Sequence, residues 1–246
     1  MADNIYKPYL GSGTVYARIA GAAAALLAIG NCSLLEPTVK EDKKTLKDYS
    51  KPGGGTYASV SRIDTVNIKL KLHDLNKTNV ARAVFGSESV ITGATLLDEV
   101  AIAYKGGLMP LAHLNPTGVV VTNSAATITY AAGVDYEVKG GGLLILATGT
   151  ILDAQSLKVD YSFTDYNKVE AMTTGAVILE LHFEGLNEAD SGKPVILDVY
   201  RAQLSPTKAL SLLGDNFSEL DLEAEVLKDP SKTGVGISQY FRVKMA

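Results

Sequence analysis

The residues of this chain that are best suited to chemistry are three histidines and one cysteine, and their spacing does not favour a reactive site. His73, His113 and His182 stand far apart and form neither an HxH nor an HExxH pattern, so the sequence predicts no zinc site. Cys32 has no second cysteine to pair with, which favours a buried, unreactive thiol in a reducing compartment.

Glycine-rich and acidic stretches offer no clearer site. The glycines near Gly11, Gly53 and Gly140 lack the lysine and the helix that complete a phosphate-binding loop, and we expect turns there. Carboxylates stand side by side at Asp98 and Glu99, but a glycosidase usually adds an aromatic platform for sugar, and the chain has no tryptophan. We therefore predict a protein that is not an enzyme and that needs no metal or cofactor.

Length and charge set the remaining bounds. A chain of 246 residues and 26.0 kDa can bury a sizeable core as one large domain or as a domain with an insert. Charged residues make up 20% of it and the net charge is only -4, which argues against a general basic binder of nucleic acid and against wholesale disorder.

The apolar segment 21–32, GAAAALLAIGNC, resembles the core of a secretion signal with a lipid-accepting cysteine. Asn31 stands before that cysteine where a small residue is needed, and Asp3 precedes the apolar run. About ten apolar residues are too few to span a bilayer. We expect a buried strand or a packed loop instead, and no membrane anchor.

A charged segment interrupts the first half of the chain. Residues 40–49, KEDKKTLKDY, have no apolar period, and the glycines of residues 52–55 follow them, which predicts an exposed loop or a long hairpin. Strands are expected on both sides, because Val66, Ile68 and Leu70 alternate with polar residues. The segment is either a solvated loop or a mobile arm, hinged at the glycines, that reaches a neighbouring subunit. Its candidate contact residues are Lys40, Glu41, Asp42, Lys43, Lys44, Lys47 and Asp48.

One principal helix is predicted within residues 73–86, HDLNKTNVARAVFG. Asp74 or Asn76 can cap its first amides, and Gly86 is expected to end it. A second helical turn is expected over residues 206–213, which begin with a proline and precede a glycine. The apolar stripe of the principal helix comprises Val80, Ala83 and Val84.

A change of character suggests an inserted module. Residues 117–165 alternate short β-branched strands with glycine turns, and their GVDYEV and LKVDYSF segments resemble the immunoglobulin-like hairpins of many virion proteins. The remaining residues, 1–116 and 166–246, would then form a discontinuous parent domain. The alternative is that residues 117–165 are an elaborated pair of strands within the parent sheet.

Residues 181–243 join alternating strands through polar turns and contain no evident catalytic group. Within them, the apolar residues of SELDLEAEVL share one face of a predicted strand and its carboxylates share the other. A strand that carries Lys69 and Lys71 is expected to lie beside it and to offset this acidic charge by cross-strand pairing. The four carboxylates are Glu219, Asp221, Glu223 and Glu225.

These strands, the strand-to-helix run at 73–86 and the opening GSGTVYARIAG with its GNCS turn resemble the major tail tube proteins of long-tailed, siphovirus-like or myovirus-like bacteriophages. The resemblance covers residues 6–86 and 181–243. It implies a mainly β fold, a sandwich or half-barrel with one principal α-helix and an inserted small β module. It also implies a virion protein made in the bacterial host cytoplasm, which self-assembles into stacked hexameric rings for genome ejection.

The resemblance assigns partners and roles. The partners are further copies of the chain, the tape measure, tail terminator and distal tail proteins, and genomic DNA that passes without specific binding. The charged segment would stack one ring on the next. Cross-strand pairing of charges, and not the resemblance, suggests that Lys69 and Lys71 bridge neighbouring subunits. The four carboxylates either form a solvated outer face or line the channel, where they would repel DNA phosphates.

Two other classes of function fit the composition. A β-sandwich module that recognises glycan or a cell surface would be a monomer with affinity for its ligand. An enzyme with a scattered site would have a deep polar pocket with carboxylates of shifted pKa.

Overall fold

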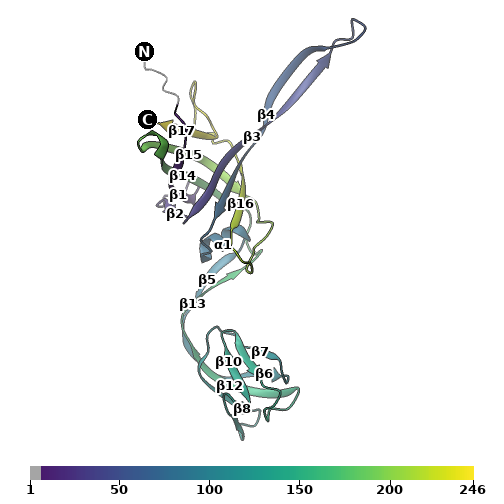
Figure 1. The fold of residues 1–246 in the computed structure, drawn as a ribbon, viewed down its shortest axis with the longest axis vertical. Helices are drawn as coiled ribbons and strands as arrows, with labels where there is room; N and C mark the ends of the chain where they lie inside the picture. Colours follow the sequence, from purple (N-terminus) through teal and green to yellow (C-terminus); the bar gives the residue numbers. More distant parts are fainter. Residues whose placement is uncertain (1–6) are drawn as a thin grey trace. The chain divides into compact units, whose positions relative to one another are not determined.

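A computed structural model describes residues 7–246, which divide into two compact units. The first unit combines the chain up to Glu88 with Val169–Ala246, and the second is Ser89–Lys168. The chain enters and leaves the second unit through β5 (Ser87–Ile91) and β13 (Tyr166–Glu170), which pair as a two-stranded sheet (Figure 1). The fold is mainly β with one α-helix, as predicted from the sequence.

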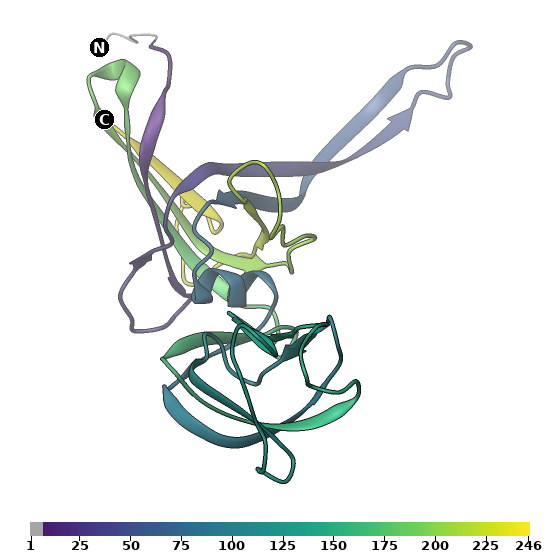
Figure 2. The ribbon, with the colours of Figure 1, turned by 60° about the horizontal axis from the view of Figure 1, so that its bottom comes forward.

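An eight-stranded sheet forms the first unit, in the order β2-β1-β14-β15-β16-β4-β3 with β17 beside β15. The sheet is strongly curved (Figure 2). The curvature brings β1 and β3, which stand near opposite ends of the strand order, to the same groove. This curvature agrees with the predicted half-barrel. The strands are β1 (Gly11–Ile19), β2 (Leu27–Ala28), β3 (Cys32–Lys47), β4 (Thr56–Leu72), β14 (Ile178–Asn187), β15 (Lys193–Leu204), β16 (Leu220–Val226) and β17 (Phe241–Met245).

The core of the first unit lies on the concave face of this sheet. Side chains alternate between the two faces of a strand, so the apolar residues of β4 and β16 that recur every second position reach the same core. Val66, Ile68 and Leu70 are at most 2% exposed, and their neighbours on β16 are buried beside them. The alternation read from the sequence of these two strands is thereby confirmed.

The principal helix, α1 (Lys77–Ala83), begins at Asn76, whose side chain accepts a hydrogen bond from the Asn79 amide (2.9 Å). Asp74 has another role, because its carboxylate accepts from the Asn31 amide (2.7 Å). Of the predicted apolar stripe, Ala83 is fully buried and Val84 packs against the core, while Val80 is only partly buried; the buried Asn79 was missed. The side-chain amide of Asn79 donates to the backbone oxygens of Ile29 (2.8 Å) and Asp74 (3.0 Å), and the bond to Ile29 fastens the helix to the loop before β3.

The predicted second helical turn at residues 206–213 is absent. The backbone amides of Ser205 and Thr207 donate to the backbone oxygens of Glu223 and Ala83, respectively. These bonds run to β16 and to α1, and not to residues of the same turn as a helix would require. The short helix that does occur is the 3-10 turn η1 (Glu188–Asp190) between β14 and β15.

The apolar segment 21–32 is mostly exposed, which corrects the prediction of a buried strand or packed loop. Its strand β2 is only two residues long and pairs with β1 at the edge of the sheet, so most of its alanines and leucines have nothing to pack against. Ile29 is the buried exception, at 4% exposed. Cys32 is half-buried and not fully buried as expected.

The second unit is a small β-sandwich, in which two sheets share one core of twelve buried residues that includes Tyr136 and Tyr161. It is larger than the predicted insert of residues 117–165, because β6 pairs with β12 and β7 pairs with β11. Residues 89–116 and 166–168 therefore belong to it and not to the parent domain. Its strands are β6 (Ala94–Ala103), β7 (Leu108–Pro110), β8 (Thr117–Asn123), β9 (Thr129–Tyr130), β10 (Tyr136–Lys139), β11 (Gly142–Ile145) and β12 (Gln155–Phe163).

Candidate assembly surfaces

The histidines lie in separate places. Within residues 7–246, no group of three or more His, Cys, Asp or Glu side chains is arranged to hold a metal. Burial raises the pKa of the Cys32 thiol, whose sulfur donates a hydrogen bond to the Leu34 backbone oxygen (3.0 Å). The histidine contacts are Ser33 for His73, the stacked Phe163 ring for His113 and Asp198 for His182.

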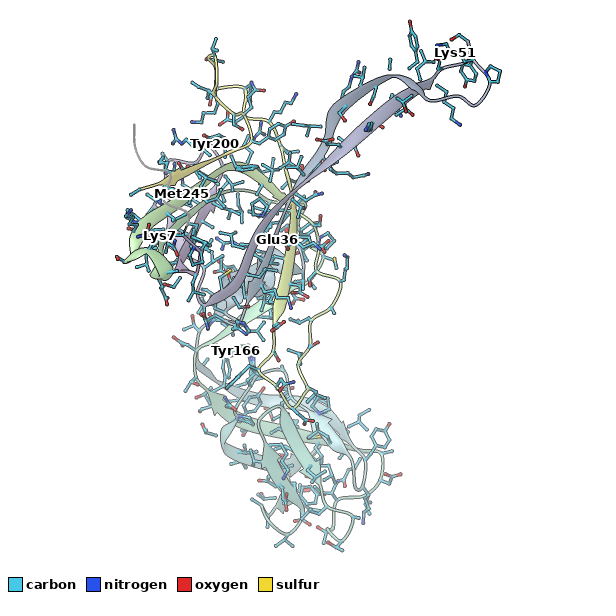
Figure 3. The ribbon with its side chains drawn as sticks, turned by 45° about the horizontal axis from the view of Figure 1, so that its top comes forward. Lys7, Glu36, Lys51, Tyr166, Tyr200 and Met245 are labelled. Carbon is cyan, nitrogen blue, oxygen red and sulfur yellow. The ribbon has the colours of Figure 1, made fainter. Side chains whose placement is uncertain are left out.

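β3 and β4 form one long antiparallel hairpin, from Cys32 opposite Leu72 at its base to Lys47 opposite Thr56 near its tip. From Val66 toward the tip, the strands of the hairpin pair only with each other among the described residues, because the pairing of β4 with β16 ends at Asn67. We call residues 40–65 the arm. Figure 3 shows it projecting from the rest of the sheet with Lys51 at its tip.

The arm contains all seven predicted contact residues. The sequence predicted an exposed loop or a long hairpin there, and the structure has the hairpin. The glycines expected to form a hinge lie instead in the tip turn, which the Asp48 amide closes by donating to the Gly55 backbone oxygen (2.8 Å). Residues 40–65 contain six basic and four acidic side chains, so the arm is basic within an acidic protein.

Ion pairs neutralise part of this charge. Lys40 pairs with Asp64 (2.9 Å) and Lys44 pairs with Asp42 (3.1 Å). These side chains are exposed, so each pair contributes little stability. Lys43 and Lys47, four residues apart on one strand face, have no ion-pair partner among the described residues.

Large apolar side chains of the arm are exposed as well. Tyr49 is 83% exposed and Tyr57 is 72% exposed, and neither belongs to the core of the first unit. A two-stranded hairpin without a third strand or a packed face is at most marginally stable in water. The arm is therefore a ribbon that a covering surface would stabilise. Its further exposed apolar residues are Leu46, Val60 and Ile63.

The acidic strand is β16, and it lies beside the lysine-bearing strand as predicted. Asp221 stands opposite Lys71 and Glu223 opposite Lys69. Lys71 also pairs with Glu219 (2.7 Å), while the fourth carboxylate, Glu225, stands opposite an uncharged asparagine. The apolar residues Leu220, Leu222, Ala224 and Val226 are buried on the other face.

Lysines compensate this acidic face within the chain. The hydrogen bond and charge of Glu219 raise the pKa of Lys71, and Lys71 lowers the pKa of Glu219 in return. Lys208, from the segment before β16, pairs with Glu223 (3.0 Å) and lowers the pKa of that carboxyl by its hydrogen bond. Asp221, 4.0 Å from Lys71, and Glu225 are the least compensated carboxylates.

A second charged cluster was not foreseen from the sequence. Asp198 on β15 accepts from His182 of β14 (2.7 Å) and from Arg242 (2.9 Å) and Lys244 (2.9 Å) of β17. Burial by itself would raise the pKa of Asp198, but hydrogen bonds from these three side chains outweigh burial and lower the pKa to about 2. The cluster fastens the last strand to the sheet.

A family model described as "Protein of unknown function UCP028589" matches residues 8–244. The chain belongs to this family. The match spans both compact units, so the small sandwich is a part of what defines the family. None of the curated proteins matches the chain. Among residues 7–246, no helix has the length and apolar character needed to cross a membrane.

Proposed function

We propose that this protein is a structural subunit of a bacteriophage tail tube, which self-assembles into rings that stack into the conduit for genome ejection. The observation that carries the proposal is the arm, a projecting hairpin that pairs only with itself and exposes aromatic side chains. Such a ribbon gains stability when another subunit covers it. Its length and its basic charge suit a contact between stacked rings.

The curved sheet of the first unit supports the same function. Its concave face holds the apolar core, and its other face carries the three carboxylates of β16, the adjacent Glu219 and their compensating lysines. Repeated around a ring, a charged face of this kind would surround DNA without holding it, because lysines paired with carboxylates have little attraction left for phosphates. We assign this face to the channel.

The remaining parts of the proposal follow the sequence resemblance. Six subunits would form a ring, and the tape measure, tail terminator and distal tail proteins would contact the tube. The protein would be made in the bacterial host cytoplasm and would reside in the virion tail. It would act without a cofactor and without catalysis.

Negative-stain electron microscopy of the concentrated, purified protein tests this function, together with its molar mass by light scattering. We expect rings and stacked tubes whose number rises with concentration. A protein that stays monomeric at all concentrations and binds glycans on an array would overturn the proposal and favour a surface-recognition module.

A further inference from the structure

A groove opens on the concave side of the first unit. Its volume is about 420 Å³, within the range of sites that hold an organic ligand or a cluster of side chains. Val15, Phe183 and Leu197 form its apolar floor, and Cys32 and Leu35 come from β3 on the opposite wall. Tyr9, Val243 and Met245 also line it.

The mouth of the groove leaves apolar surface in water. Met245 is 68% exposed, Tyr9 is 54% exposed and Val243 is 49% exposed. The absence of a side chain at Gly13 lets β14 and the Phe183 ring pack closely against β1, because a Cβ there would collide with both. The groove therefore has a tightly packed floor and an unfilled apolar opening.

The segment between β15 and β16 has the opposite property. Leu213 is 95% exposed, Phe217 is 94% exposed and Leu212 is 72% exposed, and none of the three lines the groove of its own chain. Residues 210–218 make no hydrogen bond within the described chain, although residues 205 and 207 just before them do. The segment is held at its start by Leu210, which packs against the core, but the core of the subunit does not account for Leu212, Leu213 and Phe217.

We propose that Leu212, Leu213 and Phe217 of one subunit insert into the groove of the next subunit in the same ring. This inference rests on the proposed tube function and names the contact that joins neighbours within a ring. Apolar side chains would fill an apolar cavity.

The inserting segment and the groove are different patches of one chain, so two arrangements of copies satisfy the contact. Reciprocal insertion about a two-fold axis stops at a dimer, whereas insertion of each copy into the next, head to tail, generates closed rings or open helices. The proposed tube function selects the head-to-tail arrangement. A ring is the closed form that stacked tubes require.

The native Cys32 in the groove allows a direct test, because it is the only cysteine of the chain. We would introduce Leu213→Cys, oxidise the assembled protein with copper phenanthroline, and separate it by electrophoresis without reductant. We expect a ladder of covalent dimers, trimers and larger species, since a disulfide forms only where the two Cα atoms come within about 7 Å. Two controls accompany this variant. L213C combined with Cys32→Ser lacks the cysteine of the groove, and Leu152→Cys places a cysteine at an exposed leucine of the second unit, 67% exposed.

Loss of contact is tested with Phe217→Ser against Leu152→Ser. F217S should raise the concentration for half-assembly about tenfold or more, because it removes one large buried apolar side chain from each contact, and L152S should leave it unchanged. Because Phe217 is exposed in the subunit, F217S should fold normally, which circular dichroism would verify.

Each outcome separates this contact from the tube function. Wild-type tubes without an L213C ladder, or with an equal ladder from L152C, would overturn the contact while the tube function stands. A ladder that stops at the dimer would overturn the head-to-tail arrangement. A full ladder from a protein that forms no tubes would support the contact and overturn the tube function.

Discussion

At Asp198 the pairing of three strands gives one carboxylate two cations and a histidine as neighbours. His182, Arg242 and Lys244 come from strands on either side of β15, and the Asp198 side chain is only 17% exposed. Because β17 pairs with β15 along one edge only, these contacts are a main attachment of the C-terminal strand. Asp198, which holds the C-terminal strand to the sheet, is thus a residue that no pattern in the sequence identifies.

The pKa of Asp198 predicts how stability depends on pH. The pKa lies at about 2 in the folded protein against 3.8 ordinarily, so the unfolded chain binds the proton first as the pH falls. The stabilising contribution is therefore complete above about pH 4 and is lost as the pH falls toward 2; it is on the order of 2 kcal/mol.

Urea unfolding of wild type and Asp198→Asn between pH 7 and pH 2 measures this contribution. The substitution should lower the free energy of unfolding at pH 7 and weaken its dependence on pH below 4. Asp42→Asn, at a more exposed carboxylate of the arm, serves as the matched control and should change little. Equal pH dependence in wild type and D198N would show that the cluster does not fasten β17.

At the scale of elements, the arm separates assembly from folding. None of the buried hydrophobic residues of the first unit lies between Lys40 and Thr65, although β3 and β4 contribute to the core at their bases. The register places Lys40 directly opposite Thr65, so the hairpin can be closed there by a two-residue turn. The arm can thus be removed without altering the pairing beneath it.

We predict that replacing residues 41–64 with Asn-Gly leaves a folded subunit that cannot make tubes. The free energy of unfolding should change by less than about 1 kcal/mol, since no core contact is lost. Unfolding curves and electron microscopy check the two halves of this prediction. A shortened protein that forms tubes at the wild-type concentration would show that the arm does not stack rings.

At the scale of the whole molecule, the two units have separate cores with no residue in common. Strands β6 and β8 both pair with β12, so the second unit is one structure from its first strand to its last. A deletion that follows the true boundary should therefore leave the first unit intact, whereas one that follows the predicted insert should leave a disrupted remnant of the second unit attached to it.

Deleting residues 89–168 with a short Gly-Ser linker should give a soluble protein that still forms tubes, of smaller outer diameter. Deleting only residues 117–165 should give insoluble protein, because it removes β12 and leaves the apolar strand β6 without a partner. Solubility and tube diameter in electron micrographs distinguish the two variants. Loss of assembly in the longer deletion would place the second unit within the tube contacts.

The charge of the β16 face leads to a prediction for the assembled tube. Asp221→Lys with Glu225→Lys changes the two least compensated carboxylates and leaves the pairs of Glu219 and Glu223 in place. If this face lines the channel, the variant tubes should retain DNA at low salt and release it as salt is raised. Filter binding across a salt series measures this retention.

The matched control carries the same change of charge elsewhere. Glu137→Lys with Glu188→Lys alters two exposed carboxylates away from β16, on β10 and η1. Tubes of this control should pass DNA as the wild type does. Equal DNA retention by both variants would mean that net charge, and not the β16 face, governs the interaction.

The sequence by itself determined the features that depend on neighbours along the chain. A strand's faces alternate at every residue, so the pattern from Leu220 to Val226 already separated its buried side from its charged side. The helix cap was predictable to within two candidates, Asp74 and Asn76, because a capping side chain acts within three residues, and the structure selects Asn76. The mainly β fold was predicted from such alternating strands together with the family resemblance that they carry.

Only the tertiary structure decided which strands lie together and in what register. The Asp198 cluster joins residues up to 62 positions apart, counting from His182 to Lys244, and the groove joins β1, β3, β15 and β17. The boundary of the second unit depended on β6 pairing with β12, some 60 residues later. Local patterns leave pairing partners open, because many strands of similar alternation compete for the same edge, and the burial of one common core selects among them.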